Sequence, residues 1–397
     1  MNPDLDLLHP YPFEKLAQLF AGLDTPTPPS IALSPIALSI GEPQHPAPAL
    51  VQDALRQHAA ELCRYPTTAG IPALRETIAH WLCRRYPLSQ LGVDNVLPVT
   101  GTREALFAFA QAVLDRSRQP LVLMPNPFYQ IYEGAALLAG GQPAYLPCTV
   151  ETGLQPDFDA VSDETWAQCQ LLYLCSPGNP TGALLDIPTM QKLIRLADQH
   201  DFIIASDECY SEIYNQTPPP GLLEACADMG RHDYARCAVF HSLSKRSNLP
   251  GLRSGFAAGD AALLKQFLRY RTYHGCAMPP HHQLASIAAW NDEAHVEENR
   301  RLYREKFAAV LDILGDTLNV QAPEAGFYLW PETPVDDQTF ARELKRTQNV
   351  TVLPGSYLSR QVDGVNPGAG RIRMALVATL DECTEGAERI RTFVRQL

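Results

Sequence analysis

Lys245 stands in a short polar segment that directly follows an apolar run of the sequence. Ser242 and Ser244 precede this lysine, and Arg253 follows it. A lysine amine at the end of a buried strand loses its proton more easily than a solvated amine, so Lys245 is a candidate Schiff-base nucleophile. Hydroxyl donors and a planar guanidinium nearby suit a phosphate group. A Schiff-base lysine beside a phosphate cup is what pyridoxal 5'-phosphate (PLP) requires.

Three further polar side chains follow apolar runs and could hold the ring of this cofactor. Asn179 is the one polar side chain locked between the prolines and glycines of a rigid loop, and its amide can donate to a phenolate oxygen. Asp207 could pair with a pyridinium nitrogen, with Glu208 as the alternative carboxylate, although a strand-end aspartate can also serve as a helix cap. Tyr210 could donate to the same phenolate oxygen as Asn179.

A glycine turn leads from a predicted strand into a helix at Gly101, Thr102 and Arg103. Free backbone N–H groups and the helix dipole would attract an anion there, although Thr102 could also act only as an N-cap. An aromatic side chain follows the next strand. We favour Tyr129 over Phe128 as a ring that stacks on the cofactor, and core packing is the alternative for either.

These motifs and their order resemble the fold-type I PLP-dependent aminotransferases of class I/II. The resemblance extends from about Gly41 to Leu376 and depends most on the Ser-x-Ser-Lys pattern that ends at Lys245. It implies that Lys245 carries the cofactor and moves the substrate proton, with Asp207 and Tyr210 as further catalytic groups. It assigns cofactor contacts to Tyr65, Gly101, Thr102, Arg103, Tyr129, Asn179, Asp207, Tyr210, Ser242, Ser244, Lys245 and Arg253.

The same resemblance implies where the substrate binds. Gly41 matches the glycine whose backbone lies over the substrate, and Asn179 is expected to reach the substrate too. Arg373 and Arg371 share one face if their segment is a strand. Arg373 matches the family's arginine that grips the α-carboxylate, for which a guanidinium is well suited.

Tyr65 matches a family tyrosine that reaches the phosphate bound in the neighbouring subunit. The resemblance therefore implies a homodimer in which Tyr65 acts across the interface. The expected partners are small amino-acid and 2-oxo-acid substrates, with neither nucleic acid nor membrane.

The implied reaction moves an amino group from an amino acid, expected to be glutamate, to a 2-oxo acid. Segments 244–256 and 366–378 are similar to the succinyldiaminopimelate transaminases of bacterial lysine biosynthesis. That similarity implies N-succinyl-2-amino-6-oxopimelate, of the diaminopimelate route, as the amino acceptor. A long diacid needs a cation far from the reacting carbon, and the candidates are Arg103, Arg246, Arg269 and Arg271.

Other activities share much of this pattern. Aspartate, alanine and aromatic aminotransferases and PLP-dependent carbon–sulfur lyases use the same core and differ mainly in substrate contacts. A non-catalytic cofactor-binding module of a transcription regulator would need a basic extension, which residues 1–30 do not supply. A lysine aldolase would not need Asn179, Asp207 and Tyr210 together.

The elements that position these residues indicate an α/β fold. Short apolar runs alternate with helix-like stretches between residues 96 and 245, which is typical of a mostly parallel sheet, and ligands bind such sheets at the carboxyl ends of the strands. The resemblance implies the aspartate aminotransferase-like fold with a seven-stranded sheet. We expect a large PLP-binding domain at 46–280 and a smaller α+β domain formed by 1–45 and 281–397.

The last third of the chain has a different pattern. Residues 295–318 are charged and periodic, which predicts a long exposed helix. Segments 326–330, 350–353 and 371–376 read as strands of a smaller sheet, and 380–396 as a closing helix. The proline-rich segment 25–30 is predicted to be a loop.

The composition excludes several classes of function. The net charge of −12 argues against a nucleic-acid binder, and no apolar run of the 397 residues approaches the ~20 residues of a membrane span. Ten scattered cysteines and an N-terminus unlike a signal peptide predict a cytoplasmic protein with reduced thiols. The adjacent His281 and His282 point apart on a helix or strand, so we expect no metal site.

Overall fold

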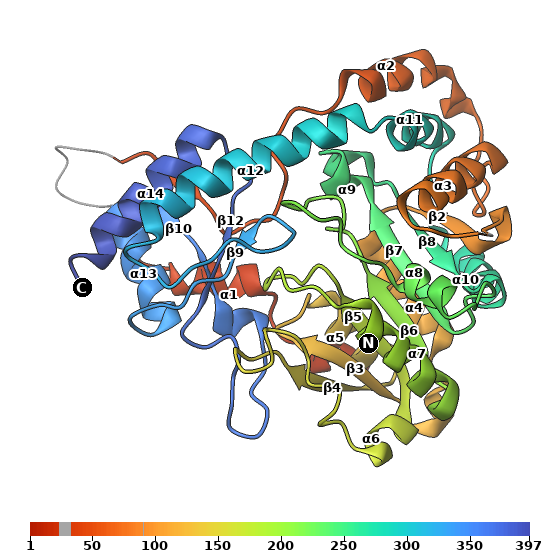
Figure 1. Cartoon of the computed structure of the whole chain (residues 1–397), viewed down its shortest axis with the longest axis horizontal. Coiled ribbons are helices and arrows are strands. Elements are labelled where there is room, and N and C mark those ends of the chain that lie inside the picture. The colour runs from red at the N-terminus through yellow and green to blue at the C-terminus, as the bar shows by residue number, and fades with distance from the viewer. Residues whose placement is uncertain (24–32, 90) are drawn as a thin grey trace.

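The computed structural model describes residues 1–23, 33–89 and 91–397. The helices and strands form two groups, a larger one around a seven-stranded sheet and a smaller one that joins the N-terminal segment to the last third of the chain (Figure 1). The predicted loop at 25–30 lies outside the described residues. The domain boundaries given above remain a prediction.

The larger sheet is mostly parallel, as predicted. Its strands follow the order β2 (Val96–Val99), β8 (Gly255–Gly259), β7 (Cys237–Ser242), β6 (Ile203–Asp207), β5 (Cys169–Cys175), β3 (Leu121–Asn126) and β4 (Gln142–Pro147). β8 is antiparallel to both of its neighbours, and the other neighbouring pairs are parallel. This topology confirms the α/β class. The sequence analysis did not predict β4 and β8.

Helices cover both faces of this sheet because its central strands are apolar on both sides. In β5, Leu172 and Leu174 belong to one core, whereas Leu171 and Tyr173 belong to a second, as the alternation of a strand requires. The first core includes residues of α3 (Pro72–Arg85), α7 (Ile187–His200), α8 (Leu222–Asp228) and α11 (Pro280–Asn291). The second includes residues of α4 (Thr102–Val113), α5 (Ile131–Leu138) and α10 (Ala261–His274).

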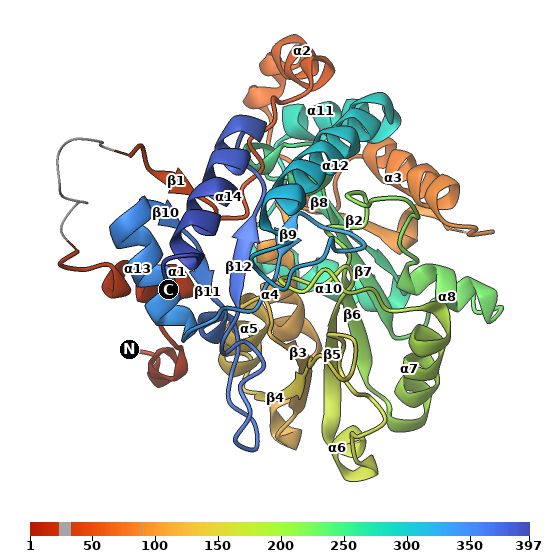
Figure 2. The same cartoon turned by 60° about the vertical axis from the view of Figure 1, so that its left-hand side comes forward.

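The smaller group brings both ends of the chain together. β1 (Ile36–Ala37) pairs in parallel with β10 (Val350–Thr351). A second small sheet is antiparallel and has the order β11 (Leu353–Pro354), β12 (Ile372–Ala375) and β9 (Tyr328–Leu329). Around these strands lie α12 (Ala294–Leu314), α13 (Asp337–Gln348) and α14 (Leu380–Val394), and α12 and α14 run side by side (Figures 1 and 2).

The remaining elements are short. They are α1 (Pro12–Leu19), α2 (Ala49–Gln57), α6 (Asp163–Gln168), α9 (Leu243–Arg246) and single 3₁₀ turns at Pro3–Leu7, Ala59–Cys63, Val93–Asn95, Arg116–Arg118, Pro250–Leu252 and Gly355–Leu358. All ten cysteines are free and most are buried. In the described part of the chain, we find no helix with the length and apolarity that a membrane crossing requires.

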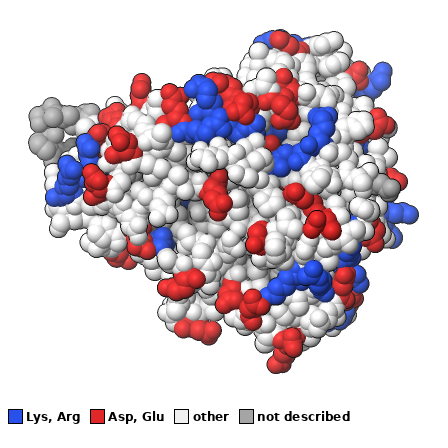
Figure 3. Space-filling model, in the orientation of Figure 1, with Lys and Arg blue, Asp and Glu red and all other residues white. Residues whose placement is uncertain are grey.

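Helix α12 is not the fully exposed helix that its charge pattern predicts. Its outer face carries ion pairs, among them Arg301 with Glu298 and Glu305, and basic and acidic side chains lie intermixed on this side of the molecule (Figure 3). Its inner face is buried and includes the charged Arg300 and Lys306 beside apolar residues. The prediction of a long helix is therefore confirmed, but only its outer face is exposed, because charged residues occupy both faces of the helix.

Candidate active site

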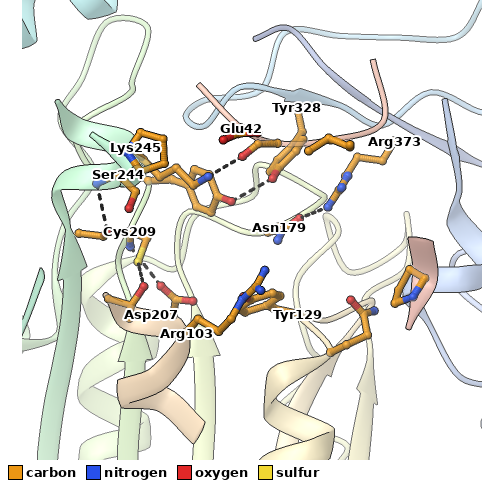
Figure 4. A pocket seen from close by; sticks show the side chains of 18 of the residues that line it. Glu42, Arg103, Tyr129, Asn179, Asp207, Cys209, Ser244, Lys245, Tyr328 and Arg373 are labelled. Carbon is orange, nitrogen blue, oxygen red and sulfur yellow. Dashed lines mark hydrogen bonds between the residues drawn. The ribbon is translucent and has the colours of Figure 1, made fainter. Parts of the chain in front are cut away.

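A cavity of about 570 Å³ opens at the carboxyl edge of the parallel strands, next to the smaller group (Figure 4). This volume is typical of small-molecule sites, which span roughly 300–1,000 Å³. Its lining includes the predicted residues Gly41, Thr102, Arg103, Tyr129, Asn179, Asp207, Tyr210, Ser242, Ser244, Lys245, Arg253 and Arg373. Parallel strands end at one edge of the sheet, so loops that are far apart in sequence meet here.

Lys245 lies on α9, the single helical turn that follows β7. Its amine donates to the carbonyl oxygen of Gly41, which belongs to the N-terminal segment. Burial disfavours the charged ammonium and lowers the pKa of Lys245 to about 8. A substantial fraction of this amine is therefore neutral, and nucleophilic, near neutral pH.

Gly101 and Arg253 form a cradle at the N-terminus of α4. Gly101 has a φ of 92°, and a Cβ placed on it would lie 2.1 Å from Nη2 of Arg253. Only glycine allows the turn and the guanidinium to come this close. Arg253 donates to the carbonyl oxygen of Pro250 at 2.9 Å and has no carboxylate partner among the residues placed by the structure. Helix N–H groups and an unpaired guanidinium together suit a phosphate.

Asp207, at the end of β6, is the carboxylate that lines the cavity on the side of the large sheet. Its Oδ2 accepts a hydrogen bond from the Tyr132 hydroxyl at 2.7 Å, and its Oδ1 accepts one from the Cys209 amide at 3.2 Å. Burial raises the pKa of Asp207, and hydrogen bonds from Cys209 and Tyr132 act in the opposite direction. The alternative, Glu208, does not line the cavity and lies 3.1 Å from Nε2 of His241.

Of the neighbouring Phe128 and Tyr129, Tyr129 is the one that lines the cavity. Its hydroxyl accepts a hydrogen bond from Nε of Arg103 at 2.7 Å. Phe128 instead is buried and stacks on Tyr145, with ring centroids 5.4 Å apart. The geometry therefore separates the two neighbouring rings into a cavity residue and a core residue.

The wall opposite the sheet carries Arg373 on β12. Its Nη1 donates to Oδ1 of Asn179 at 3.1 Å and its Nη2 to the carbonyl oxygen of Ser39 at 2.8 Å. Its Nε is buried without a hydrogen-bond partner in the described part of the structure. Arg371 does not line the cavity and pairs with Glu332. Arg373 is thus held in place by neutral groups and keeps its charge available for an anion.

Tyr328 is a cavity residue that the sequence analysis missed. Its hydroxyl lies 3.0 Å from that of Tyr210, and its ring lies 4.6 Å from the guanidinium carbon of Arg373. A Cβ on Gly41 would lie 2.1 Å from the Tyr328 hydroxyl, which explains why the loop over the cavity carries glycine. No motif marks Tyr328, because it occurs in an otherwise apolar run. Other unpredicted lining residues are Tyr11, Pro12, Phe13, Ile40, Glu42, Gln130, Cys209, Pro250, Gly251, Leu353 and Leu358.

Two predicted residues fall outside the cavity lining. Gly101 lies directly behind it, in contact range of Arg253. Tyr65 is fully exposed and does not line the cavity of its own chain. Among the candidates for a distant cation, Arg246 is buried and paired with Glu293, Arg271 is buried and paired with Glu104, and Arg269 does not line the cavity. Among the four arginines predicted as the distant cation, Arg103 alone lines the cavity.

The chemistry of the donor set fits PLP. The unpaired Arg253 and the N-terminus of α4 can hold a phosphate, Asp207 can hold a protonated ring nitrogen, and Lys245 supplies the amine. A buried cation without a counter-ion is costly, so the buried Arg373 indicates that an anion completes its part of the cavity. Arg253 is exposed and offers its guanidinium to a second anion. The fold and the site together define a PLP-dependent transferase of the aspartate aminotransferase-like fold.

Comparison with known proteins narrows this class. Residues 34–390 match the family model for aminotransferase class I and II, and the chain belongs to this family. An aminotransferase of Neisseria meningitidis has a crystal structure that is similar to this one with a TM-score of 0.94 and 48% identity, over 100% of both chains.

Two curated relatives are similar over most of their length. A probable aminotransferase of Mycobacterium tuberculosis is 33% identical over 89% of this chain and 80% of its own. The LL-diaminopimelate aminotransferase of Syntrophobacter fumaroxidans is 30% identical over 98% of this chain and 97% of its own.

Proposed function

We propose that this aminotransferase passes the amino group of glutamate to N-succinyl-2-amino-6-oxopimelate on the route to diaminopimelate and lysine. The observation that carries the proposal is that three arginines, Arg103, Arg253 and Arg373, line one cavity without a carboxylate partner among the described residues. The buried Arg373 requires an anionic partner, and the more exposed Arg103 and Arg253 can bind two further anionic groups of the bound molecules.

In any aminotransferase reaction, two of these arginines would have an anionic partner. Arg253, beside the N-terminus of α4, suits the cofactor phosphate. Arg373, whose free Nε is buried, suits the α-carboxylate of the amino acid. Arg103 remains, and among the described residues its one hydrogen bond runs from Nε to the Tyr129 hydroxyl. Its terminal nitrogens are free to bind a second carboxylate, which glutamate and the proposed acceptor both have.

The other proposed roles follow from this placement. Bound PLP supplies a ring that withdraws electrons from the substrate Cα when the proton on that carbon is removed. Lys245 is the base that takes this proton and returns it, since its lowered pKa lets it do both near neutral pH. Asn179 and Tyr210 donate to the ring oxygen, Ser242, Ser244 and Thr102 assist at the phosphate, and Gly41 lies over the substrate.

LL-diaminopimelate is a second candidate substrate. The relative from Syntrophobacter fumaroxidans carries the name of an LL-diaminopimelate aminotransferase. Glu42 lines the cavity and could accept the distal ammonium group that distinguishes this compound from the succinylated one. Both candidates are long diacids, so both would use Arg103.

Half-reactions distinguish the candidates. The purified PLP-bound enzyme is mixed with glutamate, N-succinyl-LL-diaminopimelate, LL-diaminopimelate, aspartate, alanine, tyrosine or cystathionine, and the loss of the cofactor's visible absorbance is timed. We expect rapid loss with glutamate and the succinylated diamine and slow loss with alanine. Faster loss with LL-diaminopimelate would select the second candidate. Preference for aspartate, alanine or tyrosine, or release of pyruvate from cystathionine, would contradict both.

We also propose that the protein is a homodimer in which Tyr65 completes the partner's site. Tyr65 is fully exposed, and Leu62 and Tyr273 are also largely exposed apolar side chains. Exposed tyrosine and leucine side chains contribute favourable free energy when a second subunit buries them.

A further inference from the structure

Tyr132 is a buried tyrosine behind the cavity to which the sequence analysis gave no role. It lies on α5, its side chain is fully buried, and it does not line the cavity. Its hydroxyl donates to Oδ2 of Asp207 at 2.7 Å. Its ring stacks on Tyr173, with centroids 4.6 Å apart and planes 13° from parallel. The ring stacking fixes the direction in which the hydroxyl points.

We propose that Tyr132 is a positioning residue that keeps Asp207 ionised and oriented toward the ring nitrogen of PLP. Asp207 has no ion-pair partner among the described residues, and two hydrogen bonds, from Tyr132 and from the Cys209 amide, hold its two oxygens. The amide is part of the same turn as Asp207, whereas Tyr132 comes from another element. Tyr132 therefore connects the carboxylate of Asp207 to helix α5.

The carboxylate of Asp207 and the ring nitrogen of bound PLP share one proton, and the basicity of Asp207 decides which of the two holds it. Burial raises the pKa of Asp207, so the isolated carboxylate would tend to take a proton from the ring nitrogen. A hydroxyl that donates to the carboxylate stabilises its charge and makes it less basic. The titratable groups that interact with Asp207 are the hydroxyls of Tyr132, Tyr129 and Tyr210, the thiols of Cys209 and Cys175, and His241. With Tyr132 in place, the proton stays on the ring nitrogen.

The ring of Tyr132 also contacts the aromatic residue that faces the cofactor. Its edge meets Tyr129, with centroids 5.8 Å apart and planes at 85°. One buried side chain thus supports both Tyr129 and Asp207. Replacement by phenylalanine keeps the ring contacts and removes only the hydroxyl, so it separates the two effects.

The test compares Tyr132→Phe with Tyr173→Phe in the PLP-bound enzyme. Tyr173 is the matched control, since its buried hydroxyl donates to the carbonyl oxygen of Leu106 at 2.7 Å and not to Asp207. For each variant we would measure the pH midpoint of the cofactor's visible absorbance change, the affinity of the apoprotein for PLP, and kcat and KM with any reactive amino acid. These kinetic constants can be measured with any amino acid that the enzyme accepts. The test therefore remains valid if the proposed substrate turns out not to react.

We expect the absorbance midpoint of Tyr132→Phe to move to higher pH, because the ring nitrogen holds less positive charge. We expect kcat to fall by roughly ten- to a hundredfold, the range that corresponds to one hydrogen bond to a charged group. KM should change less, and Tyr173→Phe should leave the midpoint unchanged. Equal effects of both variants, or a change in thermal stability alone, would overturn the proposal.

Incorporation of 3-fluorotyrosine at position 132 gives a second measurement, which does not require that the Tyr132→Phe variant folds. Fluorine keeps the ring and the hydroxyl and makes the hydroxyl a stronger donor. The absorbance midpoint should then move to lower pH, opposite to the phenylalanine variant. An unchanged midpoint in the fluorinated enzyme would also overturn the proposal.

Discussion

At the scale of single residues, burial decides what each ionisable group of the cavity can do. Desolvation favours the neutral forms of both Lys245 and Asp207. It lowers the pKa of the lysine and raises the pKa of the carboxyl group. The amine thereby becomes a usable base, whereas the carboxylate needs hydrogen bonds to stay charged.

The first prediction concerns Lys245. Lys245→Ala removes the base and the covalent link, so kcat should fall by at least about 10²–10⁴-fold, the usual contribution of acid–base catalysis. The cofactor should still bind, but dialysis should remove it, because the phosphate cradle is intact. The control is Lys265→Ala on the exposed face of α10, which should leave kcat unchanged. Full activity of Lys245→Ala would refute the mechanism.

The pH dependence of cofactor capture is the second prediction. With a pKa of about 8, Lys245 is mostly protonated below pH 8 and mostly neutral above it. Only the neutral amine attacks the aldehyde, so the capture rate of PLP by the apoprotein should rise about tenfold per pH unit below 8 and level off above. Stopped-flow absorbance measures this rate. A rate that keeps rising to about pH 10 would show an amine with an ordinary solvated pKa.

The third prediction concerns Arg103. Arg103→Gln keeps a polar side chain but removes the charge, and an arginine–carboxylate contact contributes about 1.5–3 kcal/mol. We expect kcat/KM to fall roughly ten- to a hundredfold for glutamate and long diacids and to change little for alanine. Arg269→Gln is the matched control, since Arg269 is exposed and outside the cavity. An equal loss for alanine and glutamate would place Arg103 at the cofactor instead.

At the scale of elements, the turn between β2 and α4 shapes the proposed phosphate cradle. Gly101→Ala would force a side chain into a left-handed conformation and against Arg253. Gly153→Ala is the control, because Gly153 has a φ of 66° and nothing within 4 Å of its Cβ, so it incurs backbone strain without a clash. Each should lower stability by about 1–2 kcal/mol, but only Gly101→Ala should weaken PLP binding, as measured by titration of the apoprotein. Equal PLP affinity in the two variants would contradict the cradle.

The elements also show how far sequence can be used for prediction. Strands β5, β6 and β7 are continuous apolar runs and were predictable, as were the polar residues at their ends. β8 is Gly-Phe-Ala-Ala-Gly and β4 contains two prolines, so neither has the β-branched pattern of a strand. Tyr132 and Tyr328 could not be found because their roles depend on tertiary contacts. The Tyr132 hydroxyl meets a carboxylate 75 positions away.

At the scale of the whole molecule, the last prediction concerns the proposed dimer. The protein should sediment as a dimer, and Leu62→Asp should shift it toward monomer because the charge would be buried at the interface. Tyr65→Ala should weaken PLP binding although Tyr65 is outside the cavity of its own chain. Val365→Asp, also at an exposed apolar position, is the control and should remain a dimer. A fully active monomer would contradict shared sites.

The walls of the cavity come from segments that are made at very different times during synthesis. The groups proposed to hold the cofactor are complete once the ribosome has passed Arg253, whereas Arg373 on β12 comes near the end and must dock beside Ser39 from the beginning of the chain. The group proposed to bind the α-carboxylate is therefore the last part of the cavity to be synthesised, and a C-terminal truncation that removes β12 should abolish binding of every amino-acid substrate.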